Sequence, residues 1–274
     1  MKMLIEKIPT PVITKEHGTW AVLLIPMFAG AGVAGKLTMN FFFLALSALS
    51  FFLAYAPGQI LLRQYYGSHQ FKEKVDQAKF WTPMYLGIAL VFGVQPLREG
   101  YTLLIAAGGL AAGSFLGNFF LTRRYTKSVI SDLLAVAGLT LGAPSAYYVL
   151  TGRVDRTAML LYLFNFLFFG CSVFYVHMKI RASATKLSIM TPRDKFSLGK
   201  MNLAYHIIVI SLVGALATLH TTSIIALLFF VPMFIHALYG TLSLSCKIRF
   251  KNLGFLLLGQ AVAFGLFLVF VGWK

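Results

Sequence analysis

The stretch that decides the fold lies at residues 157–178 and reads TAMLLYLFNFLFFGCSVFYVHM. It is 22 residues long and contains no Asp, Glu, Lys or Arg. A helix of about 20 apolar residues crosses the hydrocarbon core of a bilayer. Because that core has no water to satisfy backbone N–H and C=O groups, a segment inside it must pair them internally, as a helix does. The stretch therefore predicts a transmembrane helix.

Similar apolar runs recur along the whole chain. Hydrophobic residues make up 58% of it and charged residues only 12%, whereas a soluble domain has about 25% charged residues. Half of that charge is too little to cover a surface in water, so most of the surface must face lipid. The sequence predicts an all-α, polytopic membrane protein, a single domain over residues 1–274 with nine helices. The other eight runs are 19–35, 40–62, 82–96, 101–121, 129–150, 202–219, 222–239 and 253–273.

The net charge of +16 comes from 24 Lys and Arg residues that lie in short segments between the apolar runs. They form no long basic tail, so we expect no nucleic-acid partner. Alternate connections differ sharply in charge, with 19 basic residues on one side and five on the other. Basic residues accumulate on the cytoplasmic side of membrane proteins. The pattern predicts a cytoplasmic N-terminus and a C-terminus outside.

Two cytoplasmic connections are longer than the others, residues 63–81 and 179–201. Long loops in compact proteins are often binding loops or lids. Polar residues gather near the same side of the predicted helices, where they are expensive to bury in a membrane. We therefore expect a cytoplasm-facing cavity. Its candidate binding residues are Lys15, His17, Tyr55, Gln59, Arg63, Asn118, His177, Arg181, Asn202, His206 and His236.

Each of these residues also has a structural interpretation. Arg63 and Arg181 could extend to lipid headgroups, and single histidines could serve in packing. Asp132 follows Ser131 at the start of an apolar run and is interpreted as part of a helix cap. Recurrence favours a functional role, because Gln59-x3-Arg63 and His177-x3-Arg181 each precede one of the two long connections.

Residues 15–26 read KEHGTWAVLLIP. This segment resembles the first-helix segment of the UbiA superfamily of intramembrane prenyltransferases, in which a Lys-Pro-x-Gly-Thr-type stretch leads to an apolar run ending in Pro. Nine helices with long cytoplasmic connections after the second and sixth are similar to that superfamily's layout. The Lys-x-His-Gly-x-Trp version resembles still more the YwiC-like family of bacterial membrane proteins. The resemblance implies a UbiA-like bundle in the bacterial cytoplasmic membrane.

One departure from the superfamily concerns its chemistry. Its enzymes carry two aspartate-rich motifs, at the ends of the second and sixth helices, which hold Mg²⁺ on a substrate diphosphate. The corresponding positions here are Gln59, Arg63, His177 and Arg181, which supply no carboxylate for a hard cation. No cofactor is predicted. The weak metal candidates are Glu73 and Asp76, three residues apart in the first long connection.

Three functions fit these residues. In the first, the cavity binds an anionic, phosphorylated isoprenoid lipid, as a Mg²⁺-independent or divergent prenyltransferase or as a lipid-binding protein. Arginine suits phosphate because its guanidinium group binds it bidentately. In the second, the protein transports a small anion. In the third, ranked last, His177, His206 and His236 include a pair that binds haem or a metal. No catalytic residue is assigned, and membrane lipids are the expected partners.

Overall fold

The structure is a computed structural model that describes residues 9–14, 17–66, 74–124, 128–185 and 190–270. Within these ranges every regular element is helical, which confirms the predicted all-α fold. Eight segments are long and apolar enough to cross a membrane, and Gly18–Ala34 is a shorter apolar helix. The elements are α2 (His17–Ala34), α3 (Met39–Tyr65), α4 (Val75–Arg98), α5 (Leu103–Arg124), α6 (Val129–Thr140), α7 (Gly142–Thr151), α8 (Arg156–Ala184), α9 (Pro192–Thr218), η2 (Ile224–Ala226), α10 (Leu227–Leu242) and α11 (Phe250–Phe270).

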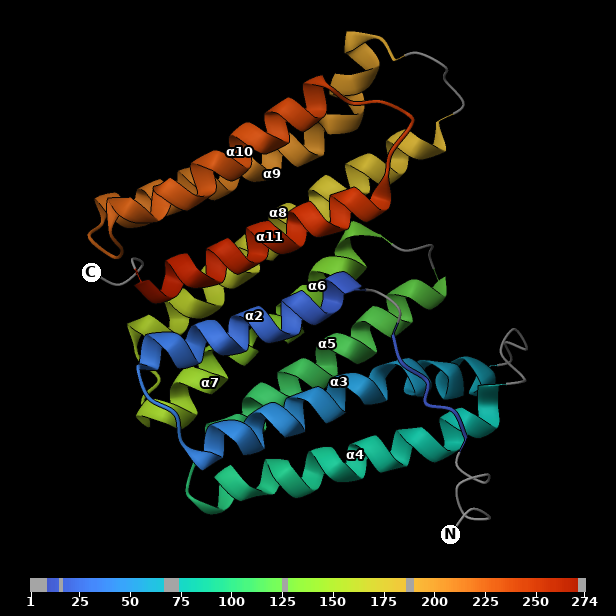
Figure 1. The fold of residues 1–274 in the computed structure, drawn as a ribbon, viewed down its shortest axis with the longest axis vertical. Helices are drawn as coiled ribbons and strands as arrows, with labels where there is room; N and C mark the ends of the chain where they lie inside the picture. The colour runs from blue at the N-terminus through green and yellow to red at the C-terminus, as the bar shows by residue number, and fades with distance from the viewer. Residues whose placement is uncertain (1–8, 15–16, 67–73, 125–127, 186–189, 271–274) are drawn as a thin grey trace.

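The helices pack side by side, with α4 at one edge of the bundle and α9 and α10 at the other (Figure 1). Their directions alternate, so the connections fall into two groups. The adjoining ends of α3 and α4, of α5 and α6, of α8 and α9 and of α10 and α11 lie on the right in Figure 1, together with residues 9–14. We call this the cavity end, and the opposite one the far end. The grouping agrees with the predicted alternation, and the cytoplasmic location of the cavity end stays a prediction.

The two long connections are shorter than predicted. In place of the 63–81 loop, α3 continues to Tyr65 and α4 begins at Val75. In place of the 179–201 loop, α8 continues to Ala184 and α9 begins at Pro192. Charged side chains interrupt the apolar runs without ending the helices, because small or apolar residues of the same stretches stay buried and continue the packed face. Val75 and Ala78 pack against Ile60, for example.

The predicted helix over 129–150 is two helices, α6 and α7, that meet at Leu141. Pro144 explains the break, because a proline has no N–H to donate to the carbonyl four residues earlier. Close packing on α2 accompanies the break. A Cβ added to Gly30 of α2 would lie 2.2 Å from the carbonyl oxygen of Ala143 in α7. The two backbones can approach this closely only because position 30 has no side chain.

The main hydrophobic core lies between α8, α9, α10 and α11 and extends to α2, α6 and α7. Phe168 and Phe264 stack at its centre, with ring centroids 4.1 Å apart and an interplanar angle of 3°. Phe230 packs edge-on against Phe264. This aromatic packing anchors α11 and α8, which both contribute to the wall of the cavity described next.

Candidate functional site: a polar-ended membrane cavity

A cavity of about 1120 Å³ opens within the bundle near the cavity end. Residues of α2, α3, α5, α6, α8 and α11 line it. Its volume exceeds the roughly 300–1,000 Å³ of a typical small-molecule pocket. Val12 and Thr14 contribute from the segment before α2. The indole N–H of Trp81 on α4 donates to the carbonyl of Pro9 at 2.9 Å, which holds that segment across the bundle.

The cavity is polar at one end and apolar at the other. Along α3, the polar residues Arg63, Gln59 and Tyr55 are followed by Phe52, and the eleven steps from Arg63 to Phe52 correspond to about 16 Å of helix. This is about half the thickness of the hydrocarbon core. The other helices follow the same order, with polar residues nearest the cavity end. The deeper wall is formed by Phe115, Val136, Leu139, Phe169, Val173 and Ala261.

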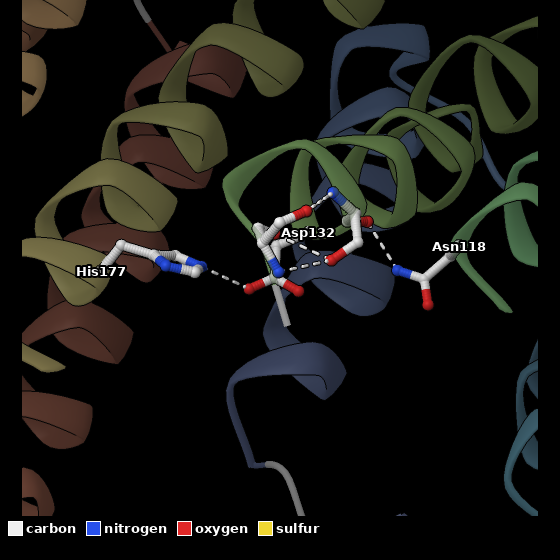
Figure 2. A network of polar contacts seen from close by, with 5 residues as sticks. Asn118, Asp132 and His177 are labelled. Atoms are coloured by element: carbon white, nitrogen blue, oxygen red, sulfur yellow. Dashed lines mark hydrogen bonds and ion pairs between the residues drawn. The ribbon is translucent and has the colours of Figure 1, made fainter. Parts of the chain in front are cut away.

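A hydrogen-bond network joins the polar residues of three helices. The Tyr55 hydroxyl on α3 donates to Oδ1 of Asn118 on α5 at 2.7 Å. Nδ2 of Asn118 donates to the backbone carbonyl of Ser131 on α6 at 2.5 Å (Figure 2). Asn118 is 5% exposed, so both of its polar atoms need these partners. The network therefore fixes α3, α5 and α6 relative to one another beside the cavity.

Asp132 faces the cavity, contrary to its interpretation as a cap. Ser128 caps α6: its hydroxyl accepts from the Ser131 N–H, and the Ser131 hydroxyl accepts in return from the Ser128 N–H. This reciprocal arrangement leaves the Asp132 carboxylate available. Its Oδ2 lies 2.8 Å from Nε2 of His177 on α8 (Figure 2). Both side chains line the cavity and are partly exposed to it, His177 by 12% and Asp132 by 36%.

Five of the predicted binding residues line this cavity: Tyr55, Gln59, Arg63, Asn118 and His177. Lys15 and the side chain of His17 lie outside the described part of the chain. Sequence reasoning missed Asp132 and Lys251, both of which line the cavity. The sequence position of each residue could have indicated its place in the cavity. Asp132 is the acidic residue of its apolar run at the level of His177, and Lys251 lies in the first turn of the last helix at the cavity end.

Asn202, His206 and His236 do not line the cavity, which corrects their predicted role in it. The contacts of Asn202 and His236 instead link α8, α9, α10 and α11. Nδ1 of His206 lies 2.8 Å from the carbonyl of Asn202, one turn earlier in α9. The ring nitrogens of His236 lie 3.3 Å from the Tyr175 hydroxyl and 3.1 Å from Nε2 of Gln260. His177 and His236 thus have separate partners, and the three histidines form no common site.

Arg181 is exposed and lies outside the large cavity, so the predicted sharing of one cavity by Arg63 and Arg181 is wrong. It lines a second, small cleft of about 30 Å³ between α8 and α9. Asn202 also lines this cleft, and so does His177. The His177 side chain therefore contributes to both the cavity and the cleft.

The weak metal candidates gain no support. Glu73 lies outside the described residues. The Asp76 side chain is 94% exposed and pairs with Lys79 on the surface at 3.7 Å. In the described part of the chain, no group of three or more His, Cys, Asp and Glu side chains is arranged to hold a metal ion.

Comparison with known proteins places the chain in a family. Residues 13–147 match the family described as YwiC-like protein. This range includes α2, α3, α5 and α6, four of the helices that line the cavity. The chain is similar to the uncharacterized protein YwiC of Bacillus subtilis (strain 168), with 29% identity over 170 residues, which is 62% of this chain and 67% of that protein. No solved structure matches the chain significantly. The chain therefore spans the membrane and is YwiC-like over residues 13–147.

Proposed function

We propose that the cavity binds a lipid with an anionic, phosphorylated headgroup. The observation that carries the proposal is the division of the cavity into a polar end and a deep apolar wall. A lipid has the same division, since its headgroup needs hydrogen bonds and charge while its tail needs apolar surface. A small inorganic anion would use the polar end alone.

The basic residues favour a negatively charged headgroup. Arg63 of α3 and Lys251 of α11 line the cavity near its polar end. Arg63 is half-buried, and its guanidinium group suits a phosphate because it presents paired N–H donors. In a partly desolvated site, hydrogen bonds between charged groups are stronger than those between neutral groups. The two cations from opposite ends of the sequence would hold the headgroup between α3 and α11.

The lipid tail would enter beside α11. Phe255 and Leu258 of α11 line the cavity and are 65% and 43% exposed. In this proposal the wall formed by α11 opens to the hydrocarbon of the membrane. A tail can pass along this wall without crossing water. The resemblance to UbiA-type prenyltransferases supports an isoprenoid tail, and a Mg²⁺-independent transfer on such a lipid is part of the same proposal.

Filling the cavity tests this proposal. Ala135 of α6 lines it, so Ala135→Phe places a ring where the ligand would lie. Leu110→Phe is the matched control, because Leu110 is 63% exposed on α5 and away from the cavity. Each variant is purified in mild detergent, and its bound lipids are measured by mass spectrometry. We expect wild type and Leu110→Phe to retain a phosphorylated lipid enriched over bulk membrane lipid, and Ala135→Phe to lose it. No enrichment in wild type, or equal retention by all three, would contradict the proposal.

A further inference from the structure

Residues 9–14, which we call the strap, lie across the polar end of the cavity. In Figure 1 the strap runs past the cavity-end part of α3 toward α4. Val12 and Thr14 of the strap line the cavity, as do Gln59 and Arg63 of α3. The strap is therefore part of the wall of the cavity, although it belongs to no helix.

The strap lies where α2 and α3 are separated. Near the far end the two helices meet, because Ala31 of α2 and Phe41 of α3 belong to one cluster of buried residues. Near the cavity end, Thr19 of α2 and Gln59 of α3 both line the cavity instead. The cavity thus lies between the two helices at this end, and the strap borders it on the side away from the deep apolar wall.

Two contacts fasten the strap to the hairpin formed by α3 and α4. The indole N–H of Trp81 on α4 donates to the carbonyl of Pro9 at 2.9 Å. The side chain of Val12 packs against a cluster that contains Ile60 of α3 and Val75 of α4. Each contact involves a side chain of the hairpin and a single residue of the strap. The strap can therefore separate from the hairpin without unfolding a helix.

The residues of the strap are suited to a movement of the whole segment. Thr10, Pro11 and Ile13 are exposed, so the outer side of the strap is not covered by other parts of the described chain. Pro9 and Pro11 have fixed φ angles and no N–H group. Segments that contain several prolines are semi-rigid. The strap can thus move as a unit once its two contacts are broken.

We infer that the strap is a lid that closes the polar end of the cavity to water, and that its release from Trp81 admits small water-soluble molecules. The inference goes beyond the proposed function, because it concerns access to the cavity whatever ligand the cavity holds. The observed position is the closed one. A hydrogen bond of this kind changes an equilibrium about two- to tenfold, so its loss should raise the open fraction by that factor.

The lid gives two kinds of molecule different routes to the cavity. In the proposed function a lipid enters beside α11, from within the membrane. A water-soluble molecule would instead reach the polar end from the cavity end of the bundle when the strap is released. While the strap is fastened, the polar end is kept from bulk water, which strengthens hydrogen bonds between charged groups there.

The reactivity of a cysteine inside the cavity tests the lid. Ser172 of α8 lines the cavity, and Ser172→Cys is introduced into a parent protein without Cys171 and Cys246. A charged methanethiosulfonate, which does not cross lipid, is added to open membrane fragments, and the rate of modification is measured. Trp81→Phe keeps an aromatic ring but lacks the N–H group that Pro9 accepts. We expect it to raise the rate at Ser172→Cys about two- to tenfold.

Val12→Thr tests the second contact of the strap. Threonine has nearly the shape of valine, so no missing atoms widen the cavity, while its hydroxyl weakens the apolar contact. This variant should also raise the rate. Tyr239→Phe is the control for Trp81→Phe, because Tyr239 is 69% exposed on α10 and does not line the cavity. It should leave the rate unchanged. A second reporter, Thr102→Cys, is exposed at the far end and should react equally fast in every variant.

Equal rates at Ser172→Cys in the parent, Trp81→Phe and Val12→Thr would overturn the inference. A parent rate at Ser172→Cys as fast as that at Thr102→Cys would also overturn it, since the polar end would then be open already. Faster modification of both reporters in Trp81→Phe would show a general loosening of the fold and would contradict a lid. The experiment uses no lipid ligand, so a failure of the proposed lipid binding is recognised separately, in the co-purification of lipid.

Discussion

Nε2 of His177 on α8 lies 2.8 Å from Oδ2 of Asp132 on α6, at the polar end of a membrane cavity. The two residues lie 45 positions apart, and α6 and α8 pack against each other. A carboxylate within a membrane-spanning helix is costly unless it is paired. This pairing places an acid in a cavity whose other charged lining residues, among those described, are the basic Arg63 and Lys251.

The amide of Asn118 should stabilise the wall of the cavity. Asn118→Ala removes the acceptor for Tyr55 and leaves the Ser131 carbonyl without this donor. A buried polar group left without a partner costs about 1–3 kcal/mol. We expect thermal unfolding in detergent to occur at a lower temperature. Asn252→Ala, at an exposed position on α11, is the control. Equal melting temperatures for the two variants would show that the network contributes no stability.

The close approach of α2 and α7 should tolerate no side chain at position 30. A Cβ there lies 2.2 Å from the Ala143 carbonyl oxygen, a backbone atom that cannot turn aside. Overpacking typically costs about 1–3 kcal/mol. Gly30→Ala should therefore lower the melting temperature. Gly109→Ala should leave it unchanged or raise it, because a Cβ at Gly109 meets nothing within 4 Å. The reverse order would contradict the observed packing.

The distribution of basic residues predicts that the cavity end lies in the cytoplasm. Single cysteines at exposed positions test it in a variant without Cys171 and Cys246. Ser245→Cys lies between α10 and α11 at the cavity end, and Thr102→Cys lies between α4 and α5 at the far end. A membrane-impermeant maleimide should label Thr102→Cys in intact cells. It should label Ser245→Cys only after the cells are permeabilised. Labelling of Ser245→Cys in intact cells would reverse the orientation.

Binding of the lipid should need no divalent metal ion. Excess EDTA is expected to change the affinity of wild type for phosphatidic acid by less than about twofold, a difference below 0.5 kcal/mol. Asp76→Asn should also have little effect, because that side chain pairs with Lys79 on the surface. Binding is measured by calorimetry before and after chelation. Loss of binding with EDTA, restored by Mg²⁺, would show that a metal completes the site.

Sequence reasoning located residues along the membrane normal better than across it. Tyr55, Gln59 and Arg63 were correctly assigned to one helix face because they recur every four residues. The depth of a side chain in the membrane could also be inferred, since Asn118 and His177 lie near the cavity end of their apolar runs. Depth alone does not say which helices are neighbours. Asn202 and His236 lie at a comparable depth but in the part of the bundle formed by α9 and α10.

Asp132 shows a second limit. A Ser-Asp pair at the start of a helix fits a cap formed by either residue. Local spacing cannot decide between them, because the choice depends on the hydrogen bonds that the first turn of the helix makes in the folded protein. Here Ser128 and Ser131 satisfy the first turn, and a tertiary contact with His177 engages the carboxylate. Such a contact is not encoded by any local pattern.

The affinity of Arg63→Gln for a phosphorylated lipid tests lipid binding by the cavity most directly. Arg63 lines the cavity, whereas Arg98, the matched control, is exposed at the end of α4 near the far end. Loss of one partner from a desolvated charge pair costs about 2–5 kcal/mol, and the partial exposure of Arg63 reduces this. We expect Arg63→Gln to bind phosphatidic acid at least about tenfold more weakly than wild type, a loss of about 1.4 kcal/mol, and Arg98→Gln to bind it as wild type does. Equal affinity of all three proteins would contradict the binding of the headgroup in this cavity.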